Sequence, residues 1–144
     1  MLKAVSFAAP FVVICALAGL AVTGHLFAAS PVRIAVQLGS LGLAVWARRS
    51  FARGSFRVMA PPGGETLVRR GPYRLIRHPM YSAALLLVWS GIVPQFALWP
   101  VAAGTIATCV VAARIVFEER LLRGHYKDYG EYAKTTKALI PFIA

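Results

Sequence analysis

Two polar clusters interrupt an otherwise apolar chain of 144 residues. The first reads Gly-Pro-Tyr-Arg-Leu-Ile-Arg-His-Pro-Met-Tyr over residues 71–81, and the second is Phe-Glu-Glu-Arg over residues 117–120. Arginine, histidine, tyrosine and paired glutamates can together bind a ligand that carries charges of both signs. Ionisable groups beside long apolar runs are expensive to bury, so they are usually functional or paired with one another. The two clusters therefore predict either a binding site or a set of structural ion pairs.

The functional interpretation suits S-adenosylmethionine. A carboxylate such as Glu119 can accept hydrogen bonds from ribose hydroxyls or from the ammonium group, and arginine, histidine and the N–H groups of a helix start can bind the carboxylate. Tyr73 or Tyr81 can place an aromatic face near the sulfonium cation. Methyl transfer needs alignment and exclusion of water more than acid–base groups.

The structural interpretation stays open beside it. Arg74 and Arg77 can simply neutralise Glu118 and Glu119, because structural ion pairs are common. His78, directly before Pro79, can be only a helix cap.

Four apolar segments must position these clusters. They cover about residues 5–26, 31–47, 79–93 and 96–117. The first is long enough to span a bilayer, the third is shorter than a usual span, and Ser30-Pro31 is a start signal for the second. Hydrophobic residues make up 58% of the chain and its mean hydropathy is +0.65, which favours an integral membrane protein. Its length predicts a single domain over residues 1–144.

The third and fourth segments should form an antiparallel helical hairpin, with Pro94 and Pro100 at the turn. The apolar runs on either side of this turn have comparable lengths. This symmetry predicts that the start of the third segment, with His78 and Tyr81, lies at the same depth as Glu118 and Glu119.

The tail, residues 118–144, changes character after Phe117. Leu122, Tyr126, Tyr129 and Tyr132 recur at helical spacing among charged residues, which predicts an amphipathic helix at the membrane surface. The predicted fold is therefore an all-α integral membrane protein with about four transmembrane helices, a C-terminal helical hairpin and a surface amphipathic helix.

Charge predicts the orientation. The net charge is +11, and eight arginines lie in the loop 48–78, whereas the turns on the other side carry only Arg33. The positive-inside rule then places this loop, the tail and the N-terminus in the cytoplasm. Arginines between apolar runs argue against nucleic-acid binding. Isolated cysteines and scattered histidines predict no metal site.

The same residues carry a resemblance to a known superfamily. Gly71-Pro72-Tyr73-Arg74, Arg77-His78-Pro79-Met80-Tyr81, Glu118-Glu119 and the spaced Tyr129 and Tyr132 before Pro141 resemble the isoprenylcysteine carboxyl methyltransferases and phospholipid methyltransferases, over roughly the last hundred residues. The resemblance implies an S-adenosylmethionine-dependent methyltransferase of the bacterial inner membrane. It also implies a cytoplasm-facing cofactor pocket and a lateral opening for a lipophilic acceptor.

Carried over position by position, the resemblance names eight candidate site residues. The candidates for cofactor binding are His78, Tyr81, Glu119, Tyr73, Pro79 and Glu118, and those for orienting an anionic acceptor or the cofactor carboxylate are Arg77 and Arg120. The chain departs from the family at Ala83, where glycine is frequent, and at Tyr126-Lys127, where Phe-Gly is frequent. These departures leave the acceptor open.

Other functions remain compatible with the sequence. Membrane sterol reductases that use NADPH have a similar Arg-His-Pro-Asn-Tyr motif, although Met80 replaces the asparagine here. A phospholipid N-methyltransferase and a non-enzymatic membrane scaffold are further alternatives. Because an ammonium must lose a proton before it can attack, and no dedicated base stands out besides His78 and the glutamates, the sequence favours an acid or thiolate acceptor.

Overall fold

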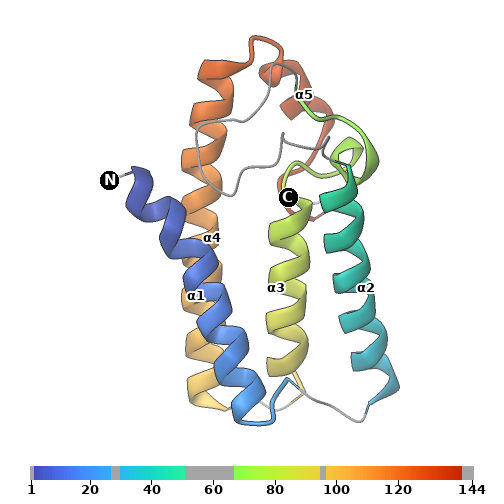
Figure 1. The fold of residues 1–144 in the computed structure, drawn as a ribbon, viewed down its shortest axis with the longest axis vertical. Coiled ribbons are helices and arrows are strands. Elements are labelled where there is room, and N and C mark those ends of the chain that lie inside the picture. The colour runs from blue at the N-terminus through green and yellow to red at the C-terminus, as the bar shows by residue number, and fades with distance from the viewer. Residues whose placement is uncertain (1, 27–29, 51–66, 95–96, 141–144) are drawn as a thin grey trace.

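The computed structural model describes residues 2–26, 30–50, 67–94 and 97–140, with side chains from residue 8 on, and within these residues every named element is a helix. The elements, shown in Figure 1, are α1 (Leu2–Val22), α2 (Pro31–Arg49), the 3-10 helix η1 (Gly71–Arg74), α3 (Pro79–Ile92), α4 (Leu98–His125) and α5 (Tyr129–Thr135). The all-α prediction is confirmed. Most of the loop predicted between the second and third segments, residues 51–66, lies outside the described residues.

Proline sets the starts of α2 and α3. Pro31 and Pro79 each occupy the first helical position, where the fixed φ suits a helix and the missing N–H costs nothing.

The first helix ends at Val22, four residues before the predicted end. Gly24 adopts a φ of 75°, which glycine reaches without strain, and the Leu26 N–H then bonds back to the Leu20 carbonyl at 2.9 Å.

The predicted end of the fourth segment at Phe117 is wrong. α4 continues through the glutamate pair to His125, and α5 begins separately at Tyr129. The single surface helix that the tyrosine spacing predicted is therefore divided between the end of α4 and α5. The cause is local, since neither glycine nor proline interrupts residues 105–123 and helical propagation meets no obstacle.

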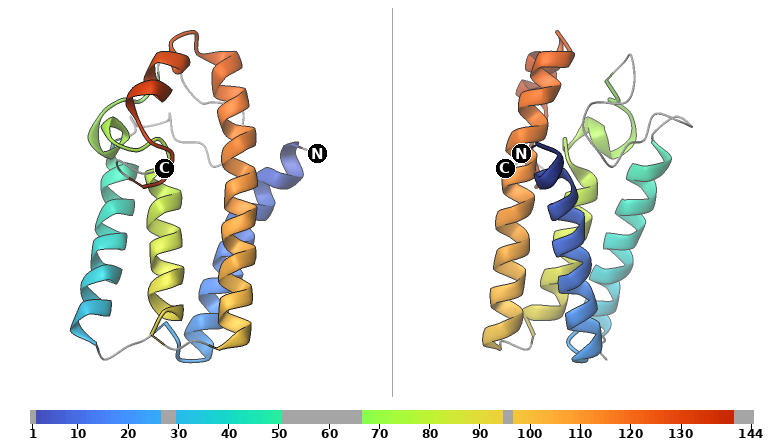
Figure 2. Two further views of the ribbon diagram at one scale, coloured as in Figure 1. Left: turned by 180° about the vertical axis from the view of Figure 1, so that it is seen from behind. Right: turned by 60° about the vertical axis from the view of Figure 1, so that its left-hand side comes forward.

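α3 occupies the middle of the bundle. It packs against α2 on one side and against α1 and α4 on the other, while α1 crosses α4 (Figures 1 and 2). The core contains Leu20 from α1, Val88 and Ile92 from α3, and Val111 from α4. A Cβ at Gly104 would lie 2.5 Å from the Ile92 side chain, so this glycine allows the close approach of α3 and α4.

The helices run between two ends of the bundle. The starts of α2 and α4 and the ends of α1 and α3 meet at one end, which we call the far end, and η1 and α5 lie at the other, the site end (Figure 1). Of the helices in the described part, α4 alone is both long and apolar enough to cross a membrane, and the apolar helices Ala8–Val22 and Pro79–Ile92 are shorter. One candidate span is in keeping with a membrane protein, and the four-span arrangement stays a prediction.

Candidate active site

The loop that enters α3 is held by the C-terminal strap, which we define as residues 136–139. Ile76 and Lys137 form a parallel β-bridge. The Arg77 N–H donates to the Lys137 carbonyl at 2.7 Å, and the His78 N–H donates to the Ala138 carbonyl at 3.1 Å. These bonds fix the backbone of two predicted site residues. The chain after α5 therefore packs back against this loop at Ala138, while residues 141–144 lie outside the described part.

Two further contacts tie the strap and α5 to this loop. The Ser82 hydroxyl donates to the Leu139 carbonyl at 2.6 Å, and the Tyr132 hydroxyl donates to the Tyr73 carbonyl at 2.7 Å. Burial raises the pKa of Tyr132 to about 12. Burial and then the charge of Glu118 raise the pKa of Tyr73. Both phenols therefore stay protonated and neutral at physiological pH.

Arg77 is a structural anchor in this arrangement. Its Nε donates to Glu119 Oε1 at 2.8 Å. Its Nη1 donates to the Ala133 carbonyl at 3.0 Å and also to the Thr136 carbonyl. The side chains of Arg77 and Glu119 are only 13% and 17% exposed. The ion pair that the structural interpretation predicted is thus present, made by Arg77, whereas Arg74 is exposed.

The His78 ring lies inside the site, and its Nε2 atom is buried there. Its side chain is buried, and among the described residues Nε2 makes no well-formed hydrogen bond, although it lies 3.5 Å from Glu119 Oε1 and can form an ion pair with it when protonated. The imidazole stacks on the Tyr81 ring with centroids 5.6 Å apart. It also stands at the N-cap position of α3 without making a side-chain cap. Capping therefore does not account for the histidine, and a buried polar atom without a partner calls for an explanation.

A second carboxylate is organised by an arginine that the sequence analysis missed. The Tyr81 hydroxyl donates to Glu118 Oε2 at 2.8 Å and accepts a hydrogen bond from Arg114 Nε. Arg114 is 7% exposed, and its Nε lies 3.9 Å from Glu118 Oε2. Because Arg114 takes a lone pair of the phenol oxygen, the Tyr81 proton is directed at Glu118. The sequence does contain a signal for Arg114, because this arginine interrupts an apolar run four residues before Glu118. Charged residues within such apolar segments are usually functional or paired with one another.

The structure brings together most of the predicted residues. Tyr81 contacts Glu118, and His78 lies near Glu119, so the predicted hairpin register is confirmed. We call the assembled group the His–Glu cluster, and it consists of Arg77, His78, Tyr81, Arg114, Glu118 and Glu119. Pro79 and Tyr73 are buried beside it.

Arg120 is not part of the cluster. It is exposed, and its guanidinium lies over the Phe117 ring at 5.9 Å. Successive positions on an α-helix are rotated by about 100°, so Arg120 cannot share the face of both glutamates. Among the described residues no group of three potential metal ligands is found.

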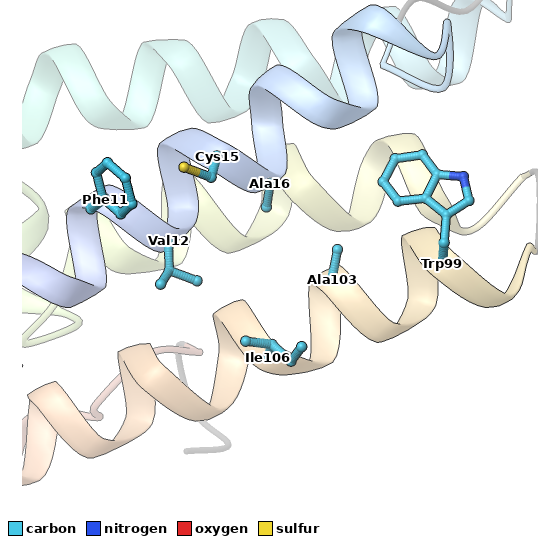
Figure 3. A pocket seen from close by; sticks show the side chains of 7 residues that line it. All are labelled: Phe11, Val12, Cys15, Ala16, Trp99, Ala103 and Ile106. Carbon is cyan, nitrogen blue, oxygen red and sulfur yellow. The ribbon is translucent and has the colours of Figure 1, made fainter.

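A separate cavity of about 270 Å³ lies between α1 and α4, as Figure 3 shows. Its lining side chains are apolar except for one thiol: Phe11, Val12, Cys15, Ala16, Trp99, Ala103 and Ile106. Along α4, Ile106 precedes Glu118 by about 18 Å at 1.5 Å per residue. The cavity therefore suits a hydrocarbon chain and is distinct from the polar cluster.

Comparison with known proteins points to one family. The sequence model of the family described as phospholipid methyltransferase matches residues 34–129. Protein-S-isoprenylcysteine O-methyltransferases B and A of Arabidopsis thaliana are 35% and 37% identical over 81 residues, which are 54% of this chain and 40% of each relative. The cobalt-zinc-cadmium resistance protein CzcN of Cupriavidus metallidurans is 37% identical over 81 residues, 55% of this chain and 37% of that protein. The chain thus spans at most two fifths of these relatives. No solved structure matches.

Proposed function

The chain belongs to the phospholipid methyltransferase family, and from this membership we propose that it transfers the methyl group of S-adenosylmethionine to a lipophilic acceptor. The observation that carries the proposal is the buried Nε2 of His78, which makes no well-formed hydrogen bond to the described residues and lies 3.5 Å from Glu119 Oε1. Most buried polar atoms of a structural network are hydrogen-bonded, so this nitrogen is a candidate ligand-binding group.

The His–Glu cluster fits this cofactor. When bound, S-adenosylmethionine supplies a methyl group that its sulfonium already activates. The imidazole of His78 and the first-turn N–H groups of α3, which have no partner within the helix, offer donors to the amino-acid carboxylate. Glu119 and the free oxygen of Glu118 offer acceptors to the ammonium and the ribose hydroxyls. The Tyr81 ring stacks on His78 and lies under the Arg114 guanidinium, so in this proposal Tyr81 orients the groups that contact the cofactor.

Arg77, Arg114 and the strap orient these groups rather than react. Arg77 holds Glu119, and Arg114 holds Tyr81, so each ligand-facing group has a fixed direction before the cofactor arrives. Such preorganisation is what a methyl transfer requires, because its rate depends on alignment of the acceptor with the sulfonium. In this proposal Arg77 acts through Glu119, and the exposed Arg120 is left to orient an anionic acceptor.

For the acceptor we propose a lipophilic molecule with an ionised oxygen or sulfur. Both glutamates are engaged by cations or by Tyr81, and this proposal assigns the His78 imidazole to the cofactor carboxylate, so no group of the cluster is assigned as a base. A carboxylate or thiolate can attack without losing a proton, whereas an ammonium cannot. The names of the Arabidopsis relatives, which refer to O-methylation of isoprenylcysteine, support this choice. A phospholipid amine is the alternative that the family description suggests.

The proposed enzyme lies in a membrane with the cluster toward the cytoplasm. Arg48 and Arg49 end α2 at the site end, and Arg69, Arg70 and Arg74 lie on the same side. Positive residues concentrate on cytoplasmic sides of membrane proteins. A bacterial inner membrane is the setting that we propose.

Binding in detergent tests the cofactor. Calorimetry should show that S-adenosylhomocysteine binds and that NADPH does not. Glu119→Gln should weaken binding by about 1.5–3 kcal/mol, the range for hydrogen bonds to charged groups. Glu131→Gln is the matched control, because Glu131 is 77% exposed and its ion pair is with the exposed Lys134. Binding of NADPH instead, or equal affinity in all three proteins, would contradict the proposal.

Transfer of a labelled methyl group then tests the acceptor. An S-prenylcysteine carboxylate should be methylated and phosphatidylethanolamine should not. The opposite result would keep the methyltransferase but replace our acceptor with the amine.

A further inference from the structure

A second buried arginine lies at the far end of the bundle, away from the His–Glu cluster. The buried face of α2 contains Arg33, Ser40 and Ala47 at intervals of seven residues. Ser40 and Ala47 are small, but Arg33 is a long cation that is only 7% exposed. Its Nε and Nη2 are buried and have no hydrogen-bond partner in the described part of the chain. An unpaired buried guanidinium is costly, so such groups normally have a counter-ion.

The chain itself offers little to neutralise Arg33. Of its five acidic residues, Glu118, Glu119, Asp128 and Glu131 all lie at the site end, and Glu65 falls outside the described residues in the loop between α2 and η1. The neighbouring polar group on α2 is already satisfied, because Gln37 donates to the Leu26 carbonyl at 2.7 Å. The ends of α1 and α3 contribute only the partial negative charge of their carbonyls.

The start of α2 adds further positive character at the same place. Ser30 makes no side-chain cap, the first turn has no acidic residue, and Pro31 follows the cap. The first helical hydrogen bond runs from the Ile34 N–H to the Ser30 carbonyl, so the N–H groups of residues 32 and 33 have no partner within the helix. Side chains on a helix lean toward its N-terminus. The Arg33 guanidinium and the start of α2 are thus two positive groups at the same end of this helix, and both can interact with an anion.

The surroundings identify the carrier of that anion. Val32, Ile34 and Leu38 are exposed large hydrophobic residues along α2, and such a face suits acyl chains. Trp99 at the start of α4 contacts the His25 ring with centroids 5.5 Å apart, and tryptophan marks the headgroup level of membrane proteins. A phosphate beside Arg33 would thus lie at headgroup depth with its hydrocarbon beside α2.

We propose that Arg33 and the N-terminus of α2 bind the phosphate of a phospholipid in the leaflet opposite the His–Glu cluster. The guanidinium supplies a planar pair of donors that matches phosphate oxygens. This lipid is neither methyl donor nor acceptor, because it lies at the other end of the bundle. The inference rests on the membrane placement of the protein and not on its methyltransferase activity, so the two can fail separately.

Lipid retention by the purified protein tests the site. The protein in detergent is incubated with equal amounts of phosphatidylglycerol and of diacylglycerol with the same acyl chains, and the bound lipid is quantified after gel filtration. Wild type should retain the phospholipid at least tenfold better than the diacylglycerol. Arg33→Gln should lose most of this preference, and Arg33→Lys should lose part of it. Arg74→Gln, which removes an exposed arginine at the site end, should behave as wild type.

Several results would overturn the proposal. If the wild-type protein retains the phospholipid no better than the diacylglycerol, the proposal is wrong. This comparison does not depend on whether Arg33→Gln folds. Equal preference for the phospholipid in wild type and in a folded Arg33→Gln variant would remove Arg33 from the site. Thermal stabilisation by millimolar inorganic phosphate, without lipid preference, would replace the lipid with a free anion. Stability that falls in Arg33→Gln with lipid retention unchanged would make Arg33 a structural cation for the ends of α1 and α3.

Discussion

Substitution of Arg77 should lower the free energy of unfolding more than substitution of any exposed charged residue. Arg77→Met keeps most of the aliphatic bulk but deletes the bonds to Glu119 Oε1, to the Ala133 carbonyl and to the Thr136 carbonyl. Breaking a buried pair from one side costs about 3–5 kcal/mol, because the remaining charge stays desolvated. Glu119 is 17% exposed and keeps Arg123 at 3.8 Å, so we expect about 3 kcal/mol, at the lower end of that range.

Unfolding by denaturant in detergent measures this loss. The matched control is Arg69→Met, which breaks another arginine–carboxylate pair at the same end of the bundle. Arg69 and Asp128 are 42% and 63% exposed, and exposed pairs contribute about 0.2–1 kcal/mol. Both substitutions remove an arginine that pairs with a carboxylate, and Arg77 is the more buried of the two and also donates to two carbonyls, whereas Arg69 donates to one.

A double variant separates the ion pair from the backbone contacts. In Arg77→Met/Glu119→Gln no unpaired carboxylate is left, so the loss should be smaller than the sum of the single losses by about 0.5–3 kcal/mol. Additive losses would mean that Glu119 does not depend on Arg77. A cost for Arg77→Met no larger than for Arg69→Met would refute the reasoning from burial altogether.

Three further predictions concern the site, the topology and pH. His78→Asn should abolish most cofactor binding in calorimetry while the melting temperature stays near wild type, because asparagine is a good N-cap; retained binding would reduce His78 to a structural residue. Reporter fusions at Pro62 and after Ala144 should both report cytoplasm, and opposite sides would exclude an even number of crossings between them. The buried Tyr132 has a pKa of about 12 against an ordinary 10.0, so folding favours its protonated form and its contribution is intact below pH 10. That contribution should be lost between about pH 10 and 12, and Tyr132→Phe should reduce this alkaline loss of unfolding free energy.

The sequence predicted those features that depend on local chemistry or on simple symmetry. Pro31 and Pro79 identified the starts of α2 and α3, because proline is favoured at the first helical position. Equal apolar lengths on both sides of a turn placed Tyr81 beside Glu118, and their hydroxyl–carboxylate distance of 2.8 Å confirms it. Neither inference needed knowledge of distant contacts.

What the sequence did not predict depends on tertiary contacts. No local pattern shows that the carbonyls of Lys137 and Ala138 would complete the backbone of Arg77 and His78. α4 continues beyond Phe117 because the helix propagates through the charged residues that follow, although the change in polarity there had suggested a boundary. The burial of Arg33 likewise depends on how α2 packs against α3.

The C-terminal strap has a consequence for biosynthesis. Arg77 and Thr136 are 59 residues apart in the chain, so at translation rates of about 5–20 residues per second the strap emerges roughly 3–12 s after the loop that it holds. During this interval the nascent helices can already enter the bilayer, yet the loop before α3 lacks its backbone partners. A ribosome that stalls within α5 would therefore leave α1 to α4 synthesised but the candidate site without the strap that fixes its backbone.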